Sequence, residues 1–204
     1  MNKLIVHLSL TLDGVMQGPA RPDEDTRGGF KHGGWAAPYV DSVNMAAAAE
    51  GMSKKGGALL LGRKTYIDFY DVWPKRNDGN PFTDKLNKSR KYVASTTLRE
   101  PLQWVNSILL KDDVPAAVTK LKEELDGDIA VLGSGILLQT LMEHNLIDEY
   151  HLSIHPLVLG TGSRLFREGS PYAALKLVKS TISTTGVILA TYCPTSRNII
   201  KGGL

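Results

Sequence analysis

The sequence predicts an α/β fold whose central sheet is mostly parallel and is extended by antiparallel strands at the C-terminal end. Two observations support this. Between residues 58 and 144, short buried-strand patterns alternate with helical patterns, which is typical of βαβ units. The tail instead carries three long strand patterns, at 150–159, 174–183 and 187–193. A chain of 204 residues is long enough for one well-buried core, so residues 1–204 are expected to form a single domain.

The N-terminal elements are predicted from periodicity and turn residues. Apolar residues alternate along the chain from Leu4 to Leu12 without a small-residue cleavage site after them, which predicts a first strand and not a signal peptide. Asp13-Gly14 predicts a turn, and residues 17–38 are rich in Gly, Pro and charge, which predicts a long loop. An alanine-rich helix is expected over 40–52, ending near 54–57, where lysines precede glycines.

The middle of the chain repeats one plan of strand, turn and helix. Short apolar runs bounded by turn residues predict strands at 58–61, 91–94, 108–110 and 129–132. Amphipathic patterns predict helices at 114–125 and 136–144. In the tail, Thr184-Thr185-Gly186 predicts the turn that joins the last two strands.

The composition limits the classes of partner and compartment. A net charge of +3 is too small to imply nucleic-acid binding, and no apolar run approaches the length that crosses a bilayer, so we expect neither a nucleic-acid nor a membrane partner. The single cysteine, Cys193, cannot form an intrachain disulfide or a metal site alone. These features favour a cytoplasmic protein.

Two predicted strands run into turns suited to an anion. The strand at 58–61 is followed by Gly62, Arg63, Lys64 and Thr65, and the strand at 129–132 by Gly133, Ser134, Gly135 and Ile136. Glycine lets the backbone approach a phosphate closely, and a helix start placed there offers free N–H donors. The alternative is that both are plain turns, and the full G-x-G-x-x-G spacing is absent because Leu138 stands three residues after Gly135.

Three further patterns are weaker candidates for a site. Ser95 and Thr96 end the strand at 91–94 and would either bond a phosphate ester or cap a turn. His151 and His155 lie four apart on a predicted strand without a third ligand nearby, so no metal site is expected. Ser134 lacks the spacing of a nucleophile elbow, which argues against a serine hydrolase.

Taken together, these motifs resemble a known family. It is the dihydrofolate-reductase-like fold, and within it the reductase domain at the C-terminus of the bifunctional riboflavin-biosynthesis enzyme, together with its stand-alone relatives. The resemblance spans residues 2–193 and rests on the segments at 9–14, 61–66, 93–96 and 131–135, with a later match at 151–166. It implies a three-layer fold of that type, a small-molecule substrate and, by analogy, a homodimer.

The resemblance also assigns roles to residues. It implies that Gly62, Arg63, Lys64 and Thr65 hold the 2′-phosphate and pyrophosphate side of NADPH, and that Ser95 and Thr96 face the adenosine phosphate. It further implies that Gly133, Ser134, Gly135 and Ile136 cradle the pyrophosphate, and that the segment from Leu12, Asp13 and Gly14 to Gly18 lines the nicotinamide. Two adjacent cations suit NADPH better than NADH, because a phosphate dianion favours charge-assisted partners.

The expected function is that of an NADPH-dependent reductase acting on a small heterocycle or carbonyl compound, with pterin or ribosylaminopyrimidine substrates suggested by the family. Asp41 is the nearest candidate for the family's substrate-contacting carboxylate, although a helix N-terminal aspartate favoured by the dipole is the alternative. The zinc-deaminase signature that accompanies the riboflavin reductase is absent from the sequence. A non-catalytic module that binds NADPH is the alternative function.

Overall fold

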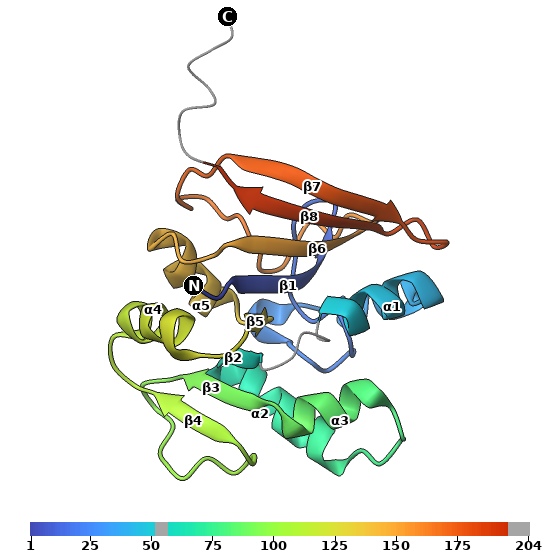
Figure 1. Ribbon diagram of the computed structural model, residues 1–204. Helices are drawn as coiled ribbons and strands as arrows, with labels where there is room; N and C mark the ends of the chain where they lie inside the picture. Colours follow the sequence, from blue (N-terminus) through green and yellow to red (C-terminus); the bar gives the residue numbers. More distant parts are fainter. Residues whose placement is uncertain (52–56, 196–204) are drawn as a thin grey trace, which may run out of the picture.

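The computed structural model describes residues 1–51 and 57–195, and it is built around one eight-stranded sheet with the order β4-β3-β2-β5-β1-β6-β8-β7 (Figure 1). The strands are β1 (Leu4–Thr11), β2 (Ala58–Gly62), β3 (Arg90–Ala94), β4 (Ser107–Leu110), β5 (Ile129–Leu132), β6 (Glu149–His155), β7 (Leu175–Ile182) and β8 (Ile188–Pro194).

The strand directions confirm the predicted sheet, which is mostly parallel with antiparallel strands at its C-terminal end. The six strands from β4 to β6 run parallel to one another, while β8 pairs antiparallel with both β6 and β7. Parallel neighbours require crossover connections, which helices supply except between β3 and β4, where residues 95–106 form a loop. Strands β7 and β8 are joined by the predicted turn at 184–186.

The helices cover both faces of the sheet, which makes three layers. They are α1 (Ser42–Gly51), α2 (Arg63–Val72), α3 (Pro81–Lys88), α4 (Val114–Glu124) and α5 (Gly135–Glu143). On one face, Val118 of α4 and Leu138 of α5 pack with Val6 and Val131 of the sheet. On the other face, α2 and α3 contribute Tyr66 and Leu86 to a second cluster, which includes Trp104. The three-layer α/β class is therefore confirmed.

The observed elements differ from the predictions in two places. The strand expected to reach Leu159 ends at His155, because Pro156 has no N–H and Leu157 accepts a hydrogen bond from Leu12 N at 2.9 Å. Helix α3 was not predicted, although Asn80 caps it through Phe82 N at 2.9 Å and Pro81 opens it. The predicted end of α1 falls mostly outside the described residues.

The loop at 17–38 is irregular, as predicted, but it is packed. It holds two short 3₁₀ turns, at Arg27–Gly29 and Ala37–Tyr39, and buries Phe30 and Trp35 against Val15. The Trp35 indole N–H donates to Gln17 O at 2.7 Å, so this tryptophan joins the later part of the loop to its first residue. Among the helices of residues 1–51 and 57–195, none is long and apolar enough to cross a membrane.

Candidate functional site

The four sequence motifs follow four neighbouring strands of the sheet. In the order β3-β2-β5-β1, these strands end at Ala94, Gly62, Leu132 and Thr11, and all four run parallel. Their carboxyl ends therefore lie along one edge of the sheet (Figure 1). In open α/β sheets this edge is the usual place for a ligand.

The turns after β2 and β5 are in direct contact. Ser134 Oγ accepts a hydrogen bond from Gly62 N at 2.8 Å and donates one to Thr65 Oγ1 at 2.9 Å. Gly133 and Ser134 both have left-handed backbone angles, with φ of 59° and 71°. A Cβ on Gly133 would lie 3.1 Å from Thr65 Oγ1, so the two turns approach too closely for a larger residue to fit without movement.

The segment after β1 joins the same site. A Cβ on Gly135 would lie 3.6 Å from the Met16 side chain, which places the segment after Gly14 beside the start of α5. Met16 lies within the segment from Leu12 to Gly18 that the resemblance assigns to the nicotinamide, although no pattern in the sequence singles out this residue. The contact brings the predicted nicotinamide and pyrophosphate segments together.

Helices α2 and α5 begin without a capping side chain. Their N-cap residues, Gly62 and Ser134, make no side-chain bond to the first turn, whereas Asp113 caps α4 through Ala116 N at 3.0 Å. The first N–H groups of α2 and α5 are thus left to an anion or to water.

Two apolar side chains near these helix starts are exposed. Leu12 is 61% exposed and Ile136 is 77% exposed, as expected for the rim of a ligand site.

The two predicted cations of α2 differ in their surroundings. Arg63 is exposed and has no ion pair within the part of the chain that the structure describes. Lys64 Nζ lies 3.5 Å from Asp68 Oδ2 and 3.4 Å from Glu24 O, so it links α2 to the loop at 17–38. Arg63 is therefore the better placed of the two to meet a phosphate.

Ser95 and Thr96 also differ from each other. Ser95 Oγ accepts from Thr97 N at 3.2 Å and from Leu98 N at 3.0 Å, so it caps the turn after β3. Thr96 is exposed at the same strand end. Of the two predicted phosphate contacts, Thr96 has the more accessible hydroxyl.

Asp13 braces the segment after β1 against the loop that follows β6. Its carboxylate accepts from Leu159 N at 3.2 Å and from Gly160 N at 2.9 Å, and Arg164 Nη2 lies 3.3 Å away. The Thr11 hydroxyl donates to the same carboxylate at 2.6 Å, and these bonds lower the pKa of Asp13 to about 2. Gly14 completes the turn with φ of 76°. The Asp13 side chain thus positions the segment, and its backbone oxygen adds to the brace by accepting from Arg164 Nε at 2.8 Å.

Asp41 lies at the start of α1 and joins that helix to the β7–β8 turn. It exchanges hydrogen bonds with Asn44 in a reciprocal cap, at 2.9 and 3.0 Å. It also accepts from Thr184 Oγ1 at 2.6 Å and from Thr185 N at 3.2 Å. These bonds hold the pKa of Asp41 well below its usual range, with the Thr184 hydroxyl as the largest cause. The geometry therefore gives Asp41 the role of a helix cap. Contact with a substrate was the other role that the sequence allowed for it.

His151 and His155, the two histidines that the sequence offers as metal ligands, contact different sets of side chains. His155 packs edge-on against Trp35 and Tyr39, while His151 contacts His7 and Glu149. Within residues 1–51 and 57–195, no three His, Cys, Asp or Glu side chains gather as a metal site.

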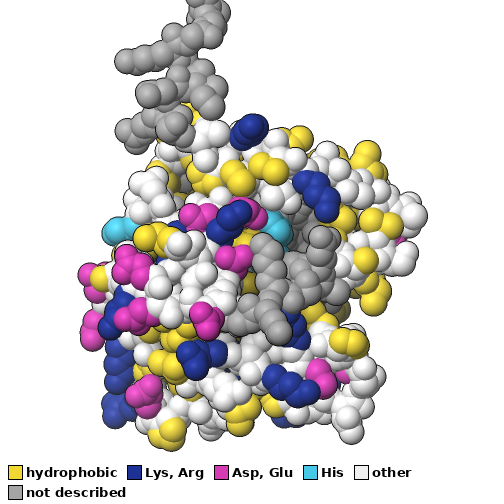
Figure 2. All heavy atoms as spheres, viewed as in Figure 1, with side chains coloured by type: hydrophobic (Ala, Val, Ile, Leu, Met, Phe, Trp, Pro, Cys, Tyr) yellow, Lys and Arg dark blue, Asp and Glu magenta, His cyan; other side chains and the backbone are white. Residues whose placement is uncertain are grey.

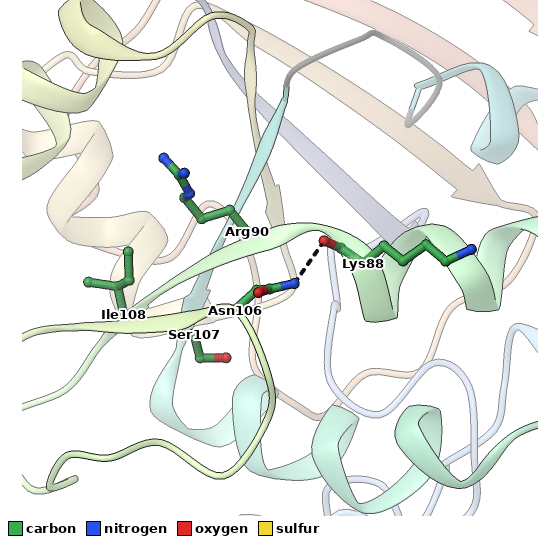
Figure 3. A pocket seen from close by; sticks show the side chains of 5 residues that line it. All are labelled: Lys88, Arg90, Asn106, Ser107 and Ile108. Atoms are coloured by element: carbon green, nitrogen blue, oxygen red, sulfur yellow. Dashed lines mark hydrogen bonds between the residues drawn. The ribbon is translucent and has the colours of Figure 1, made fainter.

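A hollow of about 440 Å³ lies elsewhere, at the amino ends of β3 and β4 (Figure 3). It is lined by Lys88, Arg90, Asn106, Ser107 and Ile108. Figure 3 shows the side chains of Lys88, Arg90 and Ser107 pointing in different directions, with Asn106 Nδ2 bonded to Lys88 O. The hollow is at the opposite edge from the four motifs and has no convergent polar groups.

Comparisons with known proteins agree with this geometry. The RibD C-terminal domain model matches residues 2–189. The uncharacterized protein YyaP of Bacillus subtilis (strain 168) is 30% identical over 203 residues, covering 93% of this chain and 94% of YyaP.

Solved structures share the fold at lower identity. A Shewanella protein named for riboflavin biosynthesis is 21% identical with a TM-score of 0.66, and the match covers 95% of this chain and 99% of that one. A dihydrofolate reductase of Enterococcus faecalis, complexed with NADP(H), is 12% identical with a TM-score of 0.60 and coverages of 95% and 97%. The chain therefore belongs to the RibD C-terminal domain family and has the dihydrofolate-reductase-like fold that its sequence predicts.

Proposed function

We propose that the protein is a cytoplasmic NADPH-dependent reductase that transfers hydride to a small heterocyclic or carbonyl substrate of the pterin or ribosylaminopyrimidine type. The observation that carries the proposal is the meeting of the turns after β2 and β5 at Gly62 and Ser134, at the carboxyl edge of the sheet. Membership in the RibD C-terminal domain family supports the same reaction class.

The residues at this edge fit a phosphorylated nicotinamide cofactor. The uncapped starts of α2 and α5 supply N–H donors for a pyrophosphate, and Gly133, which has no Cβ, lets the turn after β5 pack closely against Thr65 of α2. Arg63, exposed beside the start of α2, would pair with the 2′-phosphate that distinguishes NADPH from NADH. Thr65, through its bond with Ser134, keeps the two turns in register.

The bound cofactor would supply the hydride, so the protein's own task is alignment and exclusion of water. The Asp13 brace fixes the segment from Leu12 to Met16 against the loop after β6. The exposed side chains of Leu12 and Ile136 offer an apolar rim that a nicotinamide ring would cover. These features orient a ring at the end of β1.

A titration with NADPH and with NADH, followed by cofactor fluorescence, tests the proposal. We expect saturable binding with tighter affinity for NADPH, and then oxidation of NADPH in the presence of a pterin or aminopyrimidine panel. Binding without turnover of any compound would favour a non-catalytic module, and absence of binding by both nucleotides would overturn the cofactor assignment.

We further propose a homodimer formed through the face of β7 and β8. Leu177 pairs with Tyr192, which pairs with Tyr150 of β6, and Ile182 pairs with Ile188, which pairs with Ile154. Because Tyr150 and Ile154 lie four apart on one strand, these apolar residues share one face of the sheet. Leu177, Ile182 and Ile188 are 49%, 70% and 39% exposed there. A second copy would pack the same face against this one about a two-fold axis, which buries these side chains.

A further inference from the structure

The chain contains three Asp-Gly pairs, at Asp13-Gly14, Asp78-Gly79 and Asp126-Gly127. An Asp-Gly pair is prone to rearrange without an enzyme, because glycine has no Cβ to hinder its backbone nitrogen as that nitrogen attacks the preceding carboxyl group. By sequence, the three pairs have the same chemistry. The fold places them in three different surroundings, and these decide how freely each pair reacts.

Both reacting groups of Asp13-Gly14 are held by hydrogen bonds. The Asp13 carboxylate accepts from the Thr11 hydroxyl, from Leu159 N and from Gly160 N. The Gly14 N–H donates to Thr11 O at 2.9 Å. The nitrogen and the carboxyl group of this pair therefore cannot react until several of these bonds have broken.

Asp126-Gly127 lies in a short connection between α4 and β5 that is fixed on both sides. Before the pair, Leu125 O accepts a hydrogen bond from Asn2 Nδ2. After it, Asp128 Oδ1 accepts from Lys3 N at 2.9 Å. The Asp126 side chain is exposed, but the backbone on either side of the pair is tied to the N-terminal segment, which restricts its rotation.

Asp78-Gly79 lies in the connection between the 3₁₀ turn Trp73–Lys75 and α3, where every residue from 74 to 80 is exposed. Figure 2 shows acidic and basic side chains at the surface in the lower right of the molecule, where Figure 1 places α3 and this connection. The Gly79 N–H has no hydrogen bond within the described part of the chain, and a Cβ on Gly79 would meet nothing within 4 Å. The nucleophilic nitrogen of this pair is therefore free.

The Asp78 carboxyl group is held only by surface contacts. Its Oδ1 atom accepts from Asn80 N at 3.1 Å, and its Oδ2 atom lies 3.9 Å from Arg76 Nη1. The bond to Asn80 N directs the carboxyl group toward the residues that follow Asp78, which is the side on which Gly79 N lies. Exposed contacts of this kind are readily replaced by water, so neither keeps the carboxyl group away from that nitrogen.

We propose that Asp78-Gly79 is a modification site at which Asp78 converts spontaneously to isoaspartate. The Gly79 nitrogen attacks Cγ of the protonated Asp78 carboxyl group, the new C–N bond closes a succinimide ring, and one carboxyl oxygen leaves as water. Water then opens the ring at the former backbone carbonyl, so that the main chain runs through Cγ and the α-carboxyl group becomes free. The water released in the first step balances the water consumed in the second, so no oxidant, reductant or cofactor is needed.

The modification would disturb the start of α3. Asn80 caps this helix through Phe82 N at 2.9 Å, and Asp78 Oδ1 holds Asn80 N in turn. In isoaspartate the Asp78 side-chain carbonyl becomes part of the main chain, so the bond to Asn80 N is lost in its present form. Leu86 of α3 belongs to the second core cluster, and a weaker helix start should therefore lower the melting temperature.

The test ages the wild-type protein in warm neutral buffer, once folded and once unfolded in guanidinium chloride. Isoaspartate at each of the three pairs is then measured by mass spectrometry after digestion with an endoproteinase that cleaves before aspartate but not before isoaspartate. Asp78→Glu is the matched control, because it keeps the charge, while a glutamate must close a larger and less favourable ring. The melting temperature of each aged sample is recorded as a second measurement.

We expect isoaspartate to form at Asp78 at nearly the same rate in the folded and the unfolded protein, and more slowly at Asp126 in the folded protein. At Asp13, folding should slow the reaction by ~10-fold or more, because hydrogen bonds must break first. The melting temperature of the folded wild type should fall during ageing, and that of Asp78→Glu should fall less.

The inference is overturned if Asp78 in the folded protein forms isoaspartate no faster than Asp13 or Asp126. An equal loss of melting temperature in the wild type and in Asp78→Glu would overturn the proposed effect on α3. The experiment uses no nicotinamide cofactor and no substrate, so its result is independent of the proposed reductase function.

Discussion

Ser134 Oγ accepts the hydrogen bond of the Gly62 backbone N–H at 2.8 Å, which ties together two strand-to-helix turns that are 72 residues apart in the chain. Ser134 is also one of the few non-glycine residues with a left-handed backbone, with φ of 71°. The hydroxyl thus holds an unusual backbone conformation in place at the point where two uncapped helices begin.

The first prediction concerns this bond. Ser134→Ala removes the acceptor of Gly62 N and leaves that group unpaired, so the free energy of unfolding should fall by about 1–3 kcal/mol and NADPH affinity should weaken with it. Urea unfolding and a fluorescence titration measure the two effects. Thr119→Ala is the control, because Thr119 bonds only Pro115 O on the exposed side of α4 and should change stability by about 0.5 kcal/mol or less. Wild-type behaviour of Ser134→Ala would show that the turns are held by other contacts.

The second prediction separates the two nicotinamide cofactors. Arg63→Ala should raise the dissociation constant of NADPH by ~10-fold, or about 1.4 kcal/mol, and leave that of NADH unchanged, because only NADPH carries the 2′-phosphate. The loss should shrink as salt is added. Arg90→Ala, at the amino end of β3, is the matched control. An equal loss for both cofactors would mean that Arg63 contacts the pyrophosphate or only shapes the turn.

The third prediction concerns Asp41 at the start of α1. Asp41→Asn replaces an accepting oxygen by a donor opposite Thr185 N and the Thr184 hydroxyl, so the melting temperature at pH 7 should fall while NADPH affinity is kept. Calorimetric melting and a cofactor titration provide the two measurements. A variant that melts like the wild type would return Asp41 to consideration as the group that contacts the substrate.

The fourth prediction is a pH dependence with a definite sign. The folded state holds the pKa of Asp13 at about 2, below its ordinary value, so this carboxylate stabilises the fold above about pH 4 and loses that effect as the pH falls toward 2. Asp13→Asn should therefore be less stable than the wild type at pH 6, and the difference should disappear near pH 2. Hydrogen exchange at Leu159 and Gly160 should be faster in the variant. A stability difference that does not change with pH would contradict an electrostatic origin.

The fifth prediction tests the proposed dimer. Ile182→Lys places a charge on the apolar face of β7 and should convert the homodimer to a monomer in light scattering after gel filtration. Val105→Lys is the control, since Val105 is similarly exposed at 65% but lies before β4, at the other end of the sheet. A monomeric wild type, or a variant that stays dimeric, would exclude this face as the interface.

The sequence by itself determined the local elements and their chemistry. Apolar alternation from Leu4 to Leu12 and the buried runs before Gly62 and Gly133 are enough to predict strands, because the period of apolar residues reports which side chains must leave water. A glycine directly after a buried strand likewise indicates a turn in which the backbone can come close to another group. The short helix α3 escaped prediction, because eight residues carry too little periodicity to stand out from a loop.

Only the tertiary structure decided which of these elements are neighbours. The order β3-β2-β5-β1 places four separate motifs along one edge, and the pairing of β1 with β6 places His7 beside His151 across 144 residues of chain. The same packing assigned Asp41 to a helix cap and Asp13 to a brace, because their partners come from the β7–β8 turn and from the loop after β6. Such contacts depend on non-local burial and hydrogen bonding, which no local pattern of residues encodes.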